Sequence, residues 1–140
     1  MFSVFLLVGL VALGMWAISN IAIGLKKQKS SSGSTKYYWQ MNALWNVINF
    51  AIAFVAIIIV LAQFTSFNTN KSLQTIQIYI VATNILFDLL YVGVGLWLEN
   101  RGKKQNNPRY IGYGSSIQLQ GAFLFFFDSI FALALIVAIL

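Results

Sequence analysis

Nearly uninterrupted runs of apolar residues alternate with short polar stretches along this chain. Four such runs cover about residues 1–24, 39–62, 76–98 and 116–140. Each is about 20 residues or longer, which is the length of an α-helix that crosses the hydrocarbon core of a bilayer. The runs lack the residue-by-residue alternation of a transmembrane β-strand. The pattern therefore predicts an all-α integral membrane protein, with one transmembrane domain of four helices over residues 1–140.

The basic residues gather in two of the three predicted loops. Residues 25–38 and 99–115 contain four Lys or Arg residues each, whereas residues 63–75 contain only Lys71. Basic residues in short loops stay on the cytoplasmic side of a membrane. The distribution predicts an up-down four-helix bundle with both termini exoplasmic and the two basic loops cytoplasmic. The serine-rich segment 29–36 is expected to be a flexible connector.

The composition agrees with a membrane protein and removes several kinds of chemistry. The chain is 59% hydrophobic and 9% charged, whereas soluble domains are about 25% charged. It contains no cysteine and no histidine, which excludes thiol redox chemistry, Cys/His zinc sites and His-ligated haem. We therefore expect no metal and no cofactor.

The net charge of +6 comes almost entirely from the two basic loops. Positive loops beside a membrane are expected to contact anionic lipid headgroups. Because no nucleic-acid-binding motif accompanies the charge, we expect no nucleic-acid partner.

Polar residues inside the four runs recur at helical spacing and mark one face of each predicted helix. Because a polar side chain is costly in the bilayer centre, these faces should point into the bundle and exchange hydrogen bonds. The candidate ligand- or ion-binding residues on or beside these faces are Asp88, Asp128, Asn46, Asn49, Asn84, Tyr91, Asn42, Gln118, Trp45 and Asn20. Gln120 falls just off the polar face of its run and is not among them.

Asp88 and Asp128 are the strongest candidates because both lie near the membrane midplane. With a rise of 1.5 Å per residue they sit about 15 and 18 Å from the basic-loop ends of their runs. No Lys or Arg within a run is available to pair with them. At least one should carry a proton at neutral pH, because apolar surroundings and a like-charged neighbour both oppose ionisation.

Two interpretations of this polar cluster remain open. The aspartates are either exchangeable carboxylates of a proton or cation site, with Asn46, Asn49 and Tyr91 as neutral ligands, or members of a hydrogen-bond network that only sets helix register. Trp45 either adds an aromatic surface to a ligand pocket or simply fills the core.

The polar faces lie mainly in the half of each run nearer the basic loops, and the other half is nearly all apolar. This predicts a half-pocket open to the cytoplasmic side, with Glu99 and Arg101 at its mouth. Short loops favour sequential neighbours, which would place the third helix beside both the second and the fourth.

Several short stretches together resemble a family of small four-helix bacterial membrane proteins of unknown function. They are Gln40-Met-Asn-Ala-Leu-Trp-Asn-Val-Ile-Asn49, Asn84-x3-Asp88, Gly112-Tyr-Gly114, Gln120-Gly-Ala-Phe-Leu124 and Phe127-Asp128. The resemblance covers the second to fourth helices. It implies a location in a bacterial inner membrane and carries no catalytic role.

These observations favour a non-enzymatic membrane protein that binds a small ligand, cation or proton in the polar half-pocket, with transport of that ligand left open. The alternative is a structural or accessory subunit that docks on a larger membrane complex through the phenylalanine-rich segment 123–127. A homo-oligomer or a partner membrane subunit fits either function. Enzymatic activity is not expected, because no nucleophile, metal set or phosphate-binding loop accompanies the aspartates.

Overall fold

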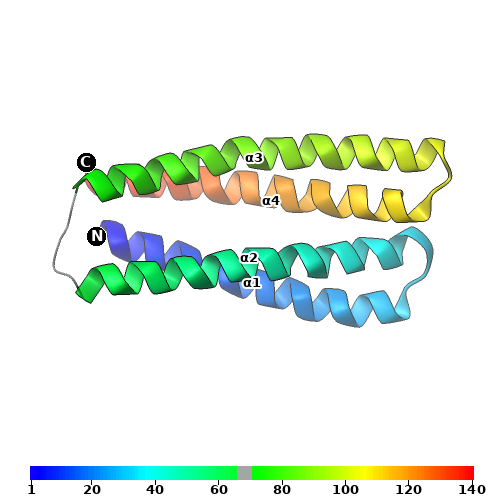
Figure 1. Ribbon diagram of the computed structural model, residues 1–140, viewed down its shortest axis with the longest axis horizontal. Helices are drawn as coiled ribbons and strands as arrows, with labels where there is room; N and C mark the ends of the chain where they lie inside the picture. The colour runs from blue at the N-terminus through cyan, green and yellow to red at the C-terminus, as the bar shows by residue number, and fades with distance from the viewer. Residues whose placement is uncertain (66–70) are drawn as a thin grey trace.

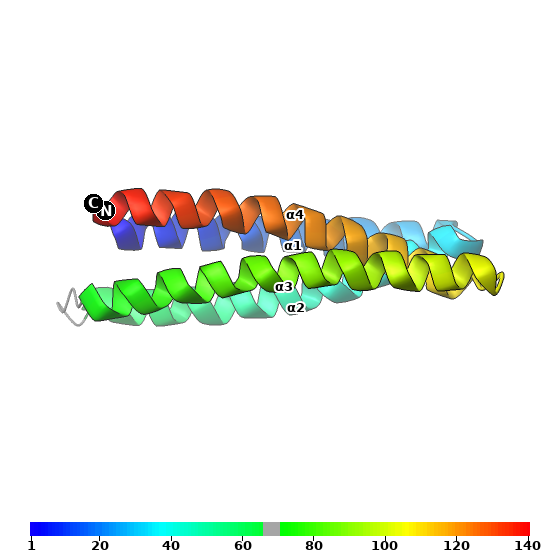
Figure 2. The same ribbon diagram turned by 90° about the horizontal axis from the view of Figure 1, so that it is seen from above.

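The computed structural model, which describes residues 1–65 and 71–140, is an antiparallel bundle of four helices (Figure 1). They are α1 (Phe2–Ser30), α2 (Gly33–Thr65), α3 (Lys71–Lys104) and α4 (Pro108–Ile139). All four are long and apolar enough to cross a membrane. The two chain termini lie together at one end, opposite the two basic loops (Figures 1 and 2). The predicted all-α bundle of four helices is confirmed, and each helix has the length and composition of a candidate membrane span.

The helices continue beyond the apolar runs, so the connections at the basic end are shorter than predicted. Residues 31 and 32 alone separate α1 from α2, and most of the expected flexible connector is helical. Gly33 has a φ of +58°, which glycine adopts without strain and which permits this sharp reversal. α3 also begins earlier than expected, at Lys71, and residues 66–70 of that predicted loop lie outside the described part of the chain.

The second basic turn is built from residues that favour a helix start. The side chain of Asn107 accepts hydrogen bonds from the backbone N–H groups of Arg109 and Tyr110 at 3.0 and 3.3 Å. Pro108 occupies the first turn of α4, where its missing N–H and fixed φ are favourable. The turn thus joins α3 and α4 into a tight hairpin.

The four helices form two hairpins, α1 with α2 and α3 with α4, which are joined mainly through α4 (Figures 1 and 2). α2 packs along α4, and α1 touches α4 more lightly. Within the described residues neither α1 nor α2 packs closely on α3. The expectation that the third helix lies beside both the second and the fourth holds fully for the fourth, whereas α2 and α3 meet only through side chains such as Trp45 and Tyr91. α4 is the helix that both hairpins share.

Glycine residues explain why α4 can approach two helices at the basic end. A Cβ atom on Gly114 would lie 2.6 Å from the carbonyl oxygen of Gly95 in α3. A Cβ atom on Gly112 would lie 2.7 Å from the backbone nitrogen of Tyr38 in α2. Both distances are too short for a side chain, so the missing Cβ atoms let the helix backbones meet. α4 is therefore wedged between α2 and α3 near the basic loops.

At the opposite end the bundle is closed by a cluster of apolar side chains from all four helices. Its buried members are Phe2, Leu6, Val60, Val81, Phe131, Ala132 and Leu135. Large apolar side chains also cover the outer surface of every helix, as expected for a surface that faces lipid instead of water. The glycine contacts and this cluster leave a less tightly packed region between them, in the middle of the bundle.

Candidate functional site

Asp88 of α3 and Asp128 of α4 meet in the middle of the bundle. Both are buried, with 3% and 8% of their surface exposed, and both line the same cavity, where their carboxyl groups interact with each other. Gly121 brings the helices together here, since its Cβ would lie 2.9 Å from the carbonyl oxygen of Asp88. Helical side chains tilt toward the N-terminus of their own helix, so in this antiparallel pair the two carboxyl groups converge.

The pairing of these carboxyl groups determines what they can do chemically. Two negative charges side by side in apolar surroundings are strongly unfavourable, so such a pair shares a proton and presents both a donor and an acceptor. The Oδ2 atom of Asp88 is buried and has no hydrogen-bond partner among the described residues. The pair can therefore accept a further hydrogen bond or a positive charge.

A cavity of about 520 Å³ lies beside the aspartate pair. All four helices contribute to its lining, and most of the lining residues belong to α2 and α3. The polar and aromatic side chains that line it are Trp45, Asn49, Gln77, Asn84, Phe87, Asp88, Tyr91, Phe127, Asp128 and Phe131, and the remaining lining side chains are aliphatic. The cavity has the size of pockets that hold small organic ligands.

Three groups beside the aspartates form the polar corner of this cavity. Trp45 and Tyr91 face each other across the α2 and α3 walls in a T-shaped contact, with ring centroids 4.9 Å apart. The Nδ2 atom of Asn49 and the Nε1 atom of Trp45 are buried without a hydrogen-bond partner in the part of the chain that is described. Buried donors without partners are uncommon, and here two of them line the same cavity.

The cavity extends in the opposite direction from the one predicted. It runs from the aspartates toward the chain termini and includes Leu6 of α1 and Val60 of α2. Its described lining does not extend toward the basic loops, where a half-pocket is predicted, because the glycine contacts bring the helices close together there. Asn84 is exposed at the rim instead of pointing into a bundle interior, since no neighbouring helix covers that side of α3.

A buried polar layer separates the cavity from the basic loops. Asn42 donates a hydrogen bond to the side chain of Asn20 at 3.2 Å and accepts one from Gln120 at 2.6 Å. Asn46 donates to the backbone oxygen of Asn42 at 2.8 Å. Asn42, Asn46 and Gln120 are almost fully buried. The layer links α1, α2 and α4, and it has the character of the register-setting network that was the alternative interpretation.

Sequence reasoning missed Gln120, which is central to this layer. Gln120 lies one or two positions from the polar face that contains Gln118 and Asp128. A single polar face predicts contact with one neighbouring helix, whereas α4 contacts both α2 and α3. A polar residue in the middle of an apolar run is a sufficient signal by itself, because it needs a partner wherever it points.

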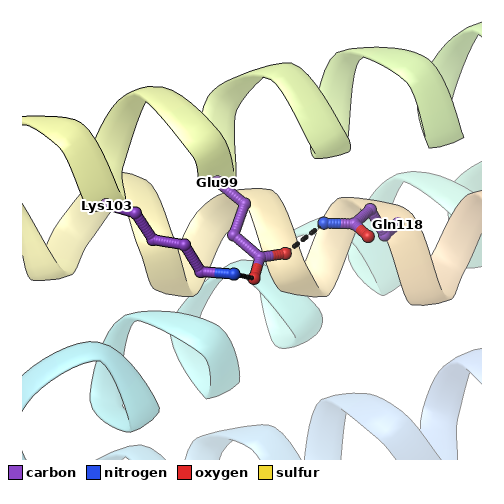
Figure 3. A network of polar contacts seen from close by, with 3 residues as sticks. All are labelled: Glu99, Lys103 and Gln118. Carbon is purple, nitrogen blue, oxygen red and sulfur yellow. Dashed lines mark hydrogen bonds and ion pairs between the residues drawn. The ribbon is translucent and has the colours of Figure 1, made fainter.

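Gln118 belongs to a separate polar cluster at the basic end (Figure 3). It donates a hydrogen bond to Glu99, which also forms an ion pair with Lys103 one turn further along α3, at 2.5 Å. Neither Glu99 nor Gln118 lines the cavity. The prediction that Glu99 stands at the mouth of the pocket is therefore wrong, and its side chain instead ties α3 to α4.

The phenylalanine-rich segment of α4 is divided between the inside and the outside of the bundle. Phe123 stacks on Trp16 of α1, with centroids 3.8 Å apart, and Phe127 lines the cavity. Phe126 points outward and is 65% exposed. Core packing thus uses part of the segment, and what remains outside resembles the lipid-facing surface of the other helices.

Comparison with known proteins identifies one family. The match is to the family of unknown function DUF6992 and covers residues 12–129. It extends from the middle of α1 to α4 and includes the polar layer and both aspartates, which is more of the chain than the resemblance noted in the sequence. No curated protein and no solved structure matches the chain.

Proposed function

This chain belongs to DUF6992, a family of unknown function, and we propose that it is a non-enzymatic membrane protein that binds a small ligand in the cavity beside Asp88 and Asp128. The observation that carries the proposal is the placement of a paired, incompletely hydrogen-bonded carboxyl group at the edge of a 520 Å³ cavity. A purely structural acid pair would be expected to be enclosed by tight packing. Here the surrounding helices leave room for a ligand.

Thermal unfolding tests this proposal, because a ligand that binds only the folded state raises its stability with the logarithm of ligand concentration. The protein is placed in phosphatidylcholine nanodiscs and titrated with three dodecyl probes, namely dodecylamine, dodecanol and dodecanoate. We expect at least one probe to raise the unfolding temperature of the wild type in a saturable manner. If none of the three does so, ligand binding in the cavity is contradicted.

Two alanine variants on α2 assign any such binding to the cavity. Ala56 lines it, whereas Ala51 is exposed on the outer face of the same helix. In Ala56→Phe the new ring occupies cavity volume. We therefore expect the apparent affinity of the probe, obtained from its stabilisation of the protein, to fall about tenfold or more, which corresponds to about 1.4 kcal/mol. Ala51→Phe adds the same ring toward lipid and should bind like the wild type. An equal loss of probe affinity in both variants would mean that the probe binds outside the cavity.

We also infer that the two basic connections face the cytoplasm and that both chain termini face the opposite side, in a bacterial inner membrane. The charge distribution supports the orientation, and the resemblance to bacterial four-helix proteins supports the location. Aromatic rings accompany the basic residues at this end, since Lys27 lies over Trp39 at 4.4 Å and Arg109 lies beside Tyr113 at 5.3 Å. Such pairs are typical of a membrane–water interface.

Single cysteines test the orientation directly, because the natural chain has none. Ser31→Cys places a thiol in the first basic turn, and a cysteine added after Leu140 places one at the C-terminus. In intact cells we expect an impermeant maleimide to label the C-terminal thiol and to leave Ser31→Cys unlabelled until the cells are lysed. Labelling of Ser31→Cys in intact cells would contradict the proposed topology and indicate the opposite orientation.

A further inference from the structure

The walls of the cavity open toward the lipid. Ile52 of α2 and Ile80 and Phe87 of α3 line the cavity, yet they are 58%, 56% and 49% exposed. The two helices that carry them do not pack closely on each other along the described residues. The entrance therefore lies between α2 and α3, at the depth of the hydrocarbon core. A molecule dissolved in the bilayer can reach the aspartates through it without passing the closely packed basic end.

The polar corner of the cavity has the chemistry of a site for an organic cation. Asp88 and Asp128 supply negative charge, and the rings of Trp45 and Tyr91 stand beside them. Carboxylates together with aromatic faces are the groups that recognise ammonium ions in proteins. Among the described residues that line the cavity there is no Lys or Arg, so no basic side chain of this lining neutralises the pair.

The shape of the remaining lining determines the rest of the ligand. Away from the polar corner, aliphatic and phenylalanine side chains cover most of the cavity, from Leu13 to Leu6 along α1 and from Ile52 to Val60 along α2. The polar exception is Gln77 of α3, which donates a hydrogen bond to Gln63 of α2 at 3.2 Å. Such an apolar surface accommodates an apolar chain through van der Waals contacts, in surroundings as apolar as the bilayer interior that the chain leaves. An anionic headgroup would be repelled by the acid pair, and a neutral headgroup would leave the negative charge of the acid pair uncompensated.

We propose that the ligand is a lipophilic amine that enters from the bilayer, with its protonated amino group bound by Asp88 and Asp128 beside the contacting rings of Trp45 and Tyr91 and its chain in the apolar part of the cavity. This inference rests on the proposed function, since it names the chemical class of the ligand for the same site. The ammonium group donates hydrogen bonds to the carboxyl oxygens, including the Oδ2 atom of Asp88 that has no partner within the described chain.

A series of dodecyl compounds tests the class of headgroup in phosphatidylcholine nanodiscs, with empty nanodiscs measured in parallel. Dodecylamine has charge and donors, dodecyltrimethylammonium has charge alone, dodecanol has a donor alone, and dodecanoate has the opposite charge. We expect dodecylamine to bind most tightly, the trimethylammonium compound next and dodecanoate most weakly. Dodecylamine should bind at least tenfold more tightly than dodecanol, because a hydrogen bond to a charged group contributes about 1.5–3 kcal/mol.

Variants of the acidic residues test the assignment of the headgroup site. Asp88→Asn and Asp128→Asn keep the size of each side chain, and both should weaken dodecylamine binding about tenfold or more while changing dodecanol binding little. Asp88→Glu retains the charge and should recover part of the affinity. Glu99→Gln is the matched control, because Glu99 is the third acidic residue of the chain and lies outside the cavity. It should bind dodecylamine like the wild type.

The outcomes separate this inference from the proposed function. If dodecanol or dodecanoate binds as tightly as dodecylamine and Ala56→Phe still abolishes binding, the cavity binds a ligand but the lipophilic-amine inference is wrong. The same conclusion follows if both Asn variants fold and bind dodecylamine normally. If no member of the series binds, both proposals are wrong.

A second pair of variants on α2 tests entry from the bilayer. Ile52 lies on the rim, whereas Leu44 is similarly exposed, at 56%, and does not line the cavity. Ile52→Trp narrows the opening between α2 and α3 and should slow the association of dodecylamine several-fold in stopped-flow tryptophan fluorescence. Leu44→Trp adds the same side chain to the lipid-facing surface and should leave the association rate unchanged. Equal rates in the wild type and both variants would contradict entry between these helices.

Discussion

Replacing Gly114 with alanine is expected to destabilise the bundle by about 1–3 kcal/mol, the cost of forcing a methyl group into a closely packed interface. The new Cβ would be 2.6 Å from the carbonyl oxygen of Gly95 and in still closer contact with the backbone nitrogen of Glu99. Both neighbours are backbone atoms of α3 and cannot rotate away. The α3–α4 hairpin would have to separate, which would also disturb the contact between Glu99 and Gln118. Thermal unfolding followed by circular dichroism in detergent measures the loss.

Gly93→Ala is the matched control for this substitution. Gly93 lies in α3, two residues before Gly95, but a Cβ atom there meets nothing within 4 Å. Alanine also favours a helix over glycine by about 0.5–1 kcal/mol. We therefore expect Gly93→Ala to be as stable as the wild type or more so. If the two variants lose stability equally, the close backbone contact at Gly114 does not explain the loss, and the described α3–α4 interface is wrong.

The helices could be predicted from the sequence because their cause is local. An apolar run of about 20 residues must satisfy its backbone hydrogen bonds internally when it lies in lipid, so each run becomes a helix. The helix ends were predicted less well. Apolarity marks where a helix meets lipid, not where it stops, and α2 begins near Gly33 although its apolar run begins at about residue 39. The turns at Gly33 and Asn107 supply the actual boundaries.

The order of helices around the bundle could not be derived from short loops alone. Loop length limits which helices are adjacent, but contact depends on which faces allow close approach. Gly95 and Gly102 on α3 and Gly114 and Gly121 on α4 are each seven residues apart, and all four meet atoms of the opposite helix. This spacing of small residues on one face is the signal that predicts the α3–α4 contact. No comparable pattern connects α2 with α3, and the cavity lies there.

The candidate site was predicted in some of its residues and not in its direction. Helical spacing placed Asp88, Asn49 and Tyr91 on inward faces, and these residues do line one cavity. The sequence pattern also suggested that polarity marks the open end of the pocket. The opposite holds at the basic end, where polar side chains such as Asn42 bind one another and fill the space between helices. Hydrogen-bond partners depend on helix order, which the sequence pattern did not provide.

The second large effect is expected from Asn42→Leu, which removes the centre of the polar layer. Asn42 is 1% exposed and binds both Asn20 and Gln120. Leucine has a similar volume but leaves the buried Nε2 atom of Gln120 without its acceptor, and an unpaired buried polar group costs about 1–3 kcal/mol. We expect a loss of stability of this size in thermal unfolding. Ser19→Leu is the control, because Ser19 is exposed and bonds only within its own helix, and it should cause little change.

The double variant Asn42→Leu/Gln120→Leu distinguishes lost pairing from lost packing. When both members of a buried hydrogen bond become apolar, no polar group remains unsatisfied between them, so the cost is much smaller than the sum of the two single substitutions. We expect the double variant to be at least as stable as Asn42→Leu alone. Additive losses would instead mean that each side chain stabilises the bundle separately. In that case α1, α2 and α4 would not be held in register by the bond between Asn42 and Gln120.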